Sequence, residues 1–345
     1  MRNFDFPTRY GRIFPPNLAW LAQRPVEPAL EPELPIIDAH HHLWDRKGQR
    51  YLLDDFLADL NTGHNIIGTV FIQCHTMYKA DGPEELRPIG ETEFVNGIAA
   101  MSASGGYGPT KIAAGIVGYA DLALGEAAGA VLDAQIRAGG GRFRGVRHSA
   151  AWDADPVIGN GCQVPGLLAQ PAFRAGLREL TKRNLAFDLW CFHTQLHEAL
   201  DLVRAMPETS FVLGHCGGPL GYGPYAGKRE EVFAHWKAAM QPLAQCPNVT
   251  VKLGGMMMRL AAYDYGALAL PPSSADLAEW WKPYILTCIE LFGAERCLFE
   301  SNFPVEKMGI GFSEIWNAFK LLAAGASASE KLALFSGTAA RVYRL

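Results

Sequence analysis

The chain has 345 residues, of which 49% are hydrophobic and 19% are charged, and its formal net charge is -4. This balance supplies enough apolar side chains for a large core and excludes an intrinsically disordered chain. Because no run of Lys or Arg concentrates positive charge, the sequence predicts no nucleic-acid partner.

The sequence also lacks the marks of export or membrane insertion. Its N-terminus lacks the continuous apolar core of a signal peptide, and no stretch reaches the roughly 18 apolar residues of a membrane span. The seven cysteines are widely spaced without a C-x-x-C pair, which predicts buried free thiols in a reducing compartment. We therefore expect a cytoplasmic protein that acts on a small-molecule substrate. A homo-oligomer is possible.

The first 35 residues differ in composition from the rest of the chain. They contain seven prolines, which disfavour regular helices and central strands. We expect residues 1–35 to form an irregular N-terminal arm and residues 36–345 to form one catalytic domain.

From Ile36 onward, short apolar runs alternate with amphipathic segments. Three of these segments, 173–184, 196–206 and 274–291, have apolar residues at helical spacing. Alternating strands and helices favour a parallel sheet, and eight strands predict an α/β fold of the closed (β/α)₈ TIM barrel type. The predicted strands are 35–42, 66–75, 111–121, 143–150, 185–193, 210–217, 248–255 and 296–303.

An open doubly wound sheet also alternates strands with helices. It usually has a glycine-rich phosphate loop after its first strand, in the register G-x-G-x-x-G. Here the first strand leads instead into three histidines, His40 to His42, and the glycine clusters elsewhere lack that register. The sequence therefore favours the barrel.

The three histidines are the first candidate site. Alternate side chains of a strand share a face, so His40 and His42 project together with Asp38, whereas His41 points toward the helices. Imidazole is a common zinc ligand, and a third imidazole from another strand would nearly complete a zinc site with one open position. His215 is the best third candidate, and His193 is the next.

Other polar residues end neighbouring strands, where a parallel barrel carries its chemistry. His75 and His193 are candidate substrate-binding residues for this reason. Arg147 ends the fourth strand, and its guanidinium can bind a substrate carboxylate through two hydrogen bonds. A salt bridge to an acidic residue on the barrel rim explains Arg147 equally well.

Six motifs occur in an order that resembles the amidohydrolase superfamily, specifically the amidohydrolase family 2 group related to lactonases. The resemblance covers Ile36 to the C-terminus. It implies a (β/α)₈ hydrolase in which His40 and His42 are the H-x-H pair and His215 is the strand-six histidine. The motifs are "IDAHHHLWD", "GVRH", "FVLGHCGGP", "VTVKLGG", "FESNFPVEK" and "GTAARVYRL".

The chain departs from the family pattern at two positions. The family usually has an aspartate where this chain has Asn302, and an amide cannot act as a base. Relatives often read "PHQL" on strand five, whereas "FHTQL" here places His193 one position early.

Two candidates can replace the missing base. Glu300 shares the inward face one pleat deeper, about 6 to 7 Å away, where burial would raise its pKa. Alternatively, a histidine is the base and Asn302 orients water or substrate. We include His40, His42, His215, Glu300 and Asn302 in the candidate catalytic group.

These residues favour a hydrolase that opens a lactone of a sugar acid or a carboxylated ring. The sequence leaves open whether a divalent metal such as zinc is bound by His40, His42 and His215, since the expected aspartate is missing. Two alternatives remain: a decarboxylase of an aromatic or unsaturated acid on the same barrel, and a catalytically decayed protein that only binds a small molecule.

Overall fold

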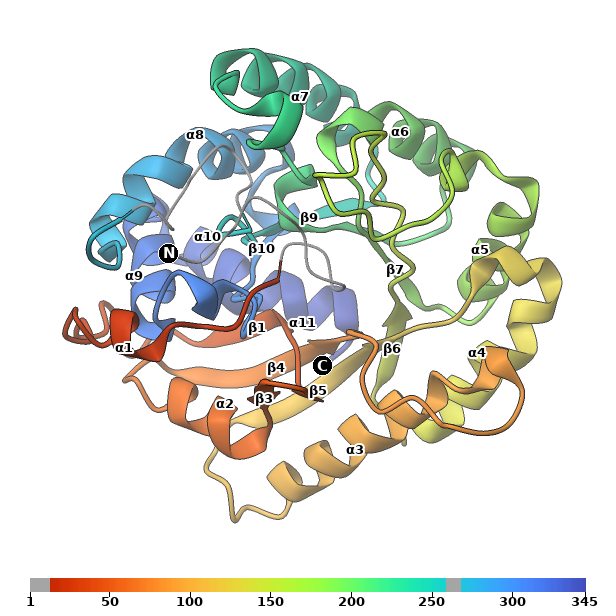
Figure 1. The fold of residues 1–345 in the computed structure, drawn as a ribbon, viewed down its shortest axis with the longest axis horizontal. Helices are drawn as coiled ribbons and strands as arrows, with labels where there is room; N and C mark the ends of the chain where they lie inside the picture. Colours follow the sequence, from red (N-terminus) through yellow and green to blue (C-terminus); the bar gives the residue numbers. More distant parts are fainter. Residues whose placement is uncertain (1–12, 259–267) are drawn as a thin grey trace.

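The computed structural model describes residues 13–258 and 268–345. Its main sheet has eight parallel strands, ordered along the chain, with helices around them, and it forms a nearly closed (β/α)₈ barrel (Figure 1). This confirms the predicted fold and all eight predicted strands. The strands are β1 (Ile36–His41), β4 (Ile66–Ile72), β5 (Lys111–Gly118), β6 (Phe143–Val146), β7 (Ala186–Leu189), β8 (Phe211–Leu213), β9 (Val249–Leu253) and β10 (Cys297–Phe299).

The barrel closes where the segment after β10 meets the end of β1. Asn302 donates its backbone N–H to the carbonyl of His40 at 2.8 Å, and His42 donates to the carbonyl of Phe303 at 2.7 Å. His41 and Phe303 form a parallel bridge. These bonds bring Asn302 beside the H-x-H pair, although the two segments are about 260 residues apart in sequence.

The helices between the strands cover the outside of the barrel (Figure 1). All three helical segments predicted from periodicity are helices. The buried face of α5 includes Phe173, Leu177 and Leu180, and burying each such side chain contributes about 1.5–3 kcal/mol. The helices are α2 (Leu53–Leu60), α3 (Ile89–Ala103), α4 (Ala128–Ala138), α5 (Pro171–Lys182), α6 (Leu196–Ala205), α7 (Arg229–Ala244), α8 (Ser274–Phe292), α9 (Phe312–Leu322), α10 (Ala328–Leu332) and α11 (Thr338–Tyr343).

A small antiparallel hairpin that the sequence did not suggest follows β1. It pairs β2 (Trp44–Arg46) with β3 (Gln49–Tyr51) across a two-residue turn. The turn contains Gly48 at φ 77°, a backbone conformation that glycine adopts without strain. The hairpin carries Trp44 and Arg46 to the end of the barrel where the strands finish.

The described part of the N-terminal arm, residues 13–35, contains one short helix, α1 (Leu18–Leu21). The arm contacts α8 and α9: the side chain of Glu27 accepts from Ser274 N at 2.9 Å, and Ser313 Oγ donates to the Glu27 carbonyl at 2.7 Å. Residues 1–12 of the predicted arm lie outside the described residues.

Apolar side chains fill the interior of the barrel. Ile37, Val70, Val117 and Leu298 pack there with Tyr343 of α11. All seven cysteines are free and buried, as the sequence predicted. Within 13–258 and 268–345, none of the helices combines the length and the apolar character that a membrane crossing requires.

Candidate active site

A cavity of about 480 Å³ lies at the carboxyl ends of the strands, the end at which a parallel barrel carries its chemistry. Its wall includes side chains that follow β1, β4, β6, β7, β8 and β10 in turn. The described residues that line it include two arginines but neither Asp nor Glu. Those on which the chemistry below depends are His42, Arg46, His75, Arg147, Trp190, His215 and Asn302.

The H-x-H pair faces inward at the end of β1. The Nε2 atoms of His40 and His42 lie 3.1 Å apart, and both side chains are buried. Nδ1 of His42 lies 2.7 Å from the carbonyl of Ile72, which only accepts, so the proton of a neutral His42 is on Nδ1 and Nε2 is the acceptor.

Both histidines are held in the neutral form. Burial lowers the pKa of His40 well below its usual value, and the charge of Lys252 lowers it further. Burial and the charge of Arg147 act in the same way on the pKa of His42. A neutral imidazole is the form that can bind a metal ion or accept a proton.

His41 points the other way, as the alternation along a strand predicts. Its Nε2 lies 2.9 Å from the hydroxyl of Thr69, and its ring stacks on Phe56 of α2 at 4.3 Å between centroids. These contacts make His41 part of the packing between the barrel and α2.

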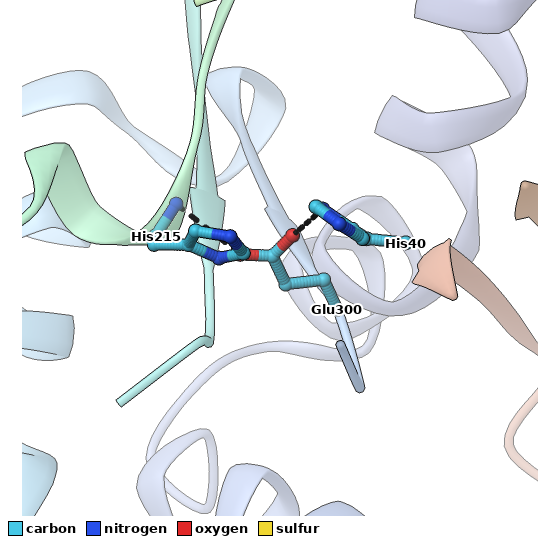
Figure 2. A group of neighbouring side chains, drawn as sticks. All are labelled: His40, His215 and Glu300. Atoms are coloured by element: carbon cyan, nitrogen blue, oxygen red, sulfur yellow. Dashed lines mark hydrogen bonds and ion pairs between the residues drawn. The ribbon is translucent and has the colours of Figure 1, made fainter. Parts of the chain in front are cut away.

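Glu300 lies between His40 and His215 (Figure 2). Its Oε1 is 2.6 Å from Nδ1 of His215, and its Oε2 is 2.7 Å from Nδ1 of His40. Burial alone would raise the pKa of this carboxyl, but the charge and hydrogen bonds of His215 and the charge of Lys252 outweigh it, so the pKa is lowered. The expectation of a raised pKa was therefore wrong: Glu300 is an ionised partner of two imidazoles.

These three residues form a donor set that fits a divalent metal ion. His40, His215 and Glu300 each offer one ligand atom, and the three atoms lie within 4.8 Å of one another. Glu300 Oε2 is buried and has no donor aligned as a hydrogen bond among the described residues. A buried carboxylate oxygen between imidazoles matches the ligand types that zinc prefers.

Beneath His40 lies a buried ion pair that the sequence analysis missed. Lys252 of β9 is fully buried, with Nζ 2.6 Å from Asp188 Oδ1 and 3.4 Å from His40 Nδ1. Tyr343 donates its hydroxyl to both oxygens of Asp188, at 3.0 and 2.9 Å. The one available signal was a lysine inside the otherwise apolar run "VTVKL".

Arg147 lies just after β6 with its guanidinium at the cavity. One terminal nitrogen is 3.4 Å from His40 Nε2, and the other donates to the carbonyl of Gln73. In 13–258 and 268–345, no carboxylate lies within ion-pair distance of Arg147, so the structure does not contain the salt bridge that was an alternative role for it.

The two remaining histidine candidates lie in different places. His75 lines the cavity, and its Nδ1 is 3.1 Å from the hydroxyl of Tyr78. His193 begins a short 3-10 turn after β7 and does not line the cavity; its Nδ1 accepts from Leu220 N at 3.3 Å. A role for His193 in substrate binding stays a prediction.

The barrel and the residues at its carboxyl end together define an enzyme of the hydrolase type with a donor set that fits a divalent metal. Residues 37–345 match the family model described as amidohydrolase, and the chain belongs to this family.

Three relatives illustrate the similarity. An uncharacterized Sinorhizobium fredii protein, y4mH, is 31% identical over 91% of this chain and 99% of its own length. An L-fucono-1,5-lactonase of Burkholderia multivorans is 26% identical over 90% and 96%. A solved amidohydrolase of Burkholderia multivorans with bound zinc is 25% identical over 90% and 99%, with a TM-score of 0.69.

Proposed function

We propose that this enzyme hydrolyses a lactone that carries a carboxylate, either a sugar-acid lactone or a carboxylated ring. The observation that carries the proposal is the guanidinium of Arg147. It lies at the cavity 3.4 Å from His40 and has no carboxylate partner among the described residues. The similarity to an L-fucono-1,5-lactonase supports the lactone, and a cavity lining with two arginines and no described acidic residue supports the carboxylate.

Binding follows from this arrangement. Arg147 binds the substrate carboxylate, because a guanidinium matches a carboxylate with two parallel hydrogen bonds. Trp44 and Trp190 line the cavity and give the ring an apolar surface to lie against. The carboxylate then fixes the lactone carbonyl near the imidazoles, and holding reactants in this way removes much of the entropic barrier.

His215 and Glu300 handle the proton. In the metal-free enzyme, His215 accepts the proton of the attacking water, while Glu300 holds its Nδ1 proton at 2.6 Å and stabilises the imidazolium. The water oxygen bonds to the carbonyl carbon, the ring C–O bond breaks, and His215 returns the proton to the leaving alkoxide. The product is a hydroxy acid.

A divalent metal such as zinc would be held by His40, His215 and Glu300, with His42 as the neighbouring nitrogen. When bound, such an ion polarises a carbonyl and lowers the pKa of water. His215 would then be a ligand, and its pairing with Glu300 would hold the imidazole in the tautomer that binds.

The test is a panel of matched lactones with and without a carboxylate, assayed for ring opening. We expect ring opening and a clear preference for the carboxylated members. A panel on which no lactone is opened while an aromatic acid releases CO₂ would replace this proposal with the decarboxylase. Turnover of neither class, with ligand binding unaffected by His40→Ala, would indicate a decayed site.

A further inference from the structure

Asn302 lies at the cavity in a left-handed backbone conformation. Its φ is 52°, a left-handed value that asparagine tolerates better than most residues, and its N–H is bonded to the carbonyl of His40. Asn302 lines the cavity, and its Oδ1 accepts no hydrogen bond from a described residue. One end of this amide is therefore free to meet a ligand.

The other end is held by Glu306, a fully buried residue that the sequence analysis did not single out. Glu306 Oε1 accepts from Asn302 Nδ2 at 3.1 Å, and Oε2 accepts from the backbone N–H of Met257 at 2.7 Å. Because an ionised carboxylate only accepts, Asn302 must turn its NH₂ group toward Glu306. An ionised Glu306 thus sets the orientation of the amide.

We propose that Glu306 is a positioning residue for the proposed lactone reaction: it holds the NH₂ end of Asn302 so that Oδ1 faces the cavity and accepts a hydrogen bond from the attacking water. The inference rests on the proposed function. It assigns the orienting of the water to Asn302 and Glu306 together, whereas proton transfer stays with His215.

A neutral side chain at position 302 suits the charge of Glu306. An aspartate in place of Asn302 would put a second carboxylate about 3 Å from Glu306, where two like charges disfavour each other. An asparagine avoids this repulsion and still presents an oxygen to the cavity. Beside an ionised Glu306, an asparagine is therefore favoured over an aspartate at this position.

The hydrogen bond between Glu306 and Asn302 also depends on whether Glu306 is protonated, so the pH dependence of kcat tests it independently. Burial raises its pKa to about 8, the hydrogen bonds of Met257 and Asn302 lower it, and the charge of Glu300 raises it. A protonated Glu306 can donate to Oδ1 and reverse the amide, so the water-orienting state is favoured as pH rises through this range. We expect kcat to rise between about pH 7 and 9 in the wild type.

Glu306→Gln separates this role from simple packing. The N–H of Met257 needs an acceptor, so the oxygen of the new amide faces Met257 and its NH₂ faces Asn302. Asn302 then has to reverse and turn its NH₂ toward the cavity. We expect kcat to fall about tenfold to a hundredfold with a smaller change in KM, and the rise with pH to disappear.

A second substitution tests for rescue. In Glu306→Gln combined with Asn302→Asp, the new carboxylate accepts from the new amide and again presents an oxygen to the cavity. We expect the double variant to recover most of the lost kcat. Glu314→Gln is the matched control, because Glu314 is also buried but lies on α9 against the arm, where it accepts from Glu27 N at 2.8 Å.

Side-chain amide NMR gives a readout that needs no substrate. In protein labelled with ¹⁵N-asparagine, the Asn302 NH₂ signal is the one that Asn302→Asp removes. We divide the exchange rate of this NH₂ by the intrinsic rate at the same pH, because hydroxide speeds the exchange of any amide. We expect strong protection by this measure in the wild type at pH 9 and weaker protection in Glu306→Gln at pH 9, or in the wild type at pH 6 if the variant does not fold. If no lactone is hydrolysed, the proposed function fails and this measurement still tests the amide. Equal protection at both pH values and in both proteins, or loss of kcat without rescue by Asn302→Asp, would overturn the inference.

Discussion

Glu300 accepts two hydrogen bonds from His215: its Oε1 lies 2.6 Å from the ring nitrogen Nδ1 and 3.2 Å from the backbone nitrogen. Both bonds end on the same carboxylate oxygen, and they connect the segments that follow β8 and β10. The second oxygen lies 2.7 Å from His40 on β1. A single buried carboxylate thereby fixes imidazoles from β1 and from the segment after β8, and this supports the first prediction.

Glu300→Gln should remove activity without removing the cavity. Its NH₂ group would face a ring nitrogen that now donates, so one imidazole must change tautomer. We expect kcat/KM to fall by about a hundredfold or more and any metal affinity to fall about tenfold to a hundredfold. Steady-state kinetics and metal titration measure the two effects, with Glu314→Gln as the control. Unchanged values for both would show that Glu300 only fills space.

Arg147→Gln should weaken the binding of carboxylated lactones more than that of uncarboxylated ones. The substitution removes the charge that binds a substrate carboxylate, so KM for a carboxylated lactone should rise about tenfold to a hundredfold, as expected for a charge-assisted hydrogen bond. The matched uncarboxylated lactone should change little. Arg147→Lys keeps the charge but loses the paired geometry, and we expect an intermediate value. An equal effect on both lactones would assign Arg147 to the structure of the site.

Metal dependence can be measured on protein purified without added metal. We expect about one equivalent of a divalent metal per chain by elemental analysis, and the loss of metal and activity together after chelation. His40→Ala should lower the metal content, whereas His64→Ala, which changes a buried histidine near α9, should not. Full activity of a metal-free sample would assign the proton transfer to His215 and Glu300 alone.

Stability should fall between about pH 6.5 and 8. Burial raises the folded-state pKa of Asp38 and Glu91 to about 7 and that of Glu306 to about 8, so the folded chain keeps protons that the unfolded chain loses near pH 4. Burial lowers the pKa of His64 and His75 to about 4, which makes stability rise with pH only up to about 6.5.

Above about pH 6.5 the three raised carboxyls therefore decide the slope, and each can lower the free energy of unfolding by up to about 1.4 kcal/mol per pH unit. Urea unfolding at several pH values across this window measures the slope, and Glu306→Gln should reduce it. A flat or rising profile in the wild type would contradict the raised pKa of these groups.

The strands and the inward histidines were predictable because their signals are local. Near-continuous apolar runs mark buried parallel strands, and alternation alone placed His40 inward and His41 outward. The place of Asn302 in the candidate catalytic group followed from the resemblance, and the closure of the barrel brings it beside His40. The hairpin that carries Trp44 was missed because three-residue strands have no detectable alternation.

The remaining contacts depend on three-dimensional geometry that the spacing of residues along the sequence does not predict. Glu306 lies four residues after Asn302, beyond the strand, so nothing in "SNFPVEK" indicates that the two side chains meet. Burial of a carboxyl predicted a raised pKa for Glu300, but the sequence did not show that two imidazoles and Lys252 surround it. Side-chain pairing across the barrel decides whether the pKa of such a buried carboxyl is raised or lowered.

The ion pair beneath His40 gives the last prediction. Lys252 is fully buried and Asp188 is nearly so, and Tyr343 satisfies both oxygens of the carboxylate. Lys252→Met leaves Asp188 buried without its cation, which should cost about 3–5 kcal/mol in the free energy of unfolding. Adding Asp188→Asn removes the unpaired charge, so the double variant should recover most of this loss, as measured by urea unfolding.

The double variant should still show reduced kcat, because Lys252 acts on His40 from 3.4 Å. If the two single substitutions are additive in stability, the pair is not coupled and Lys252 is not placed there to balance Asp188.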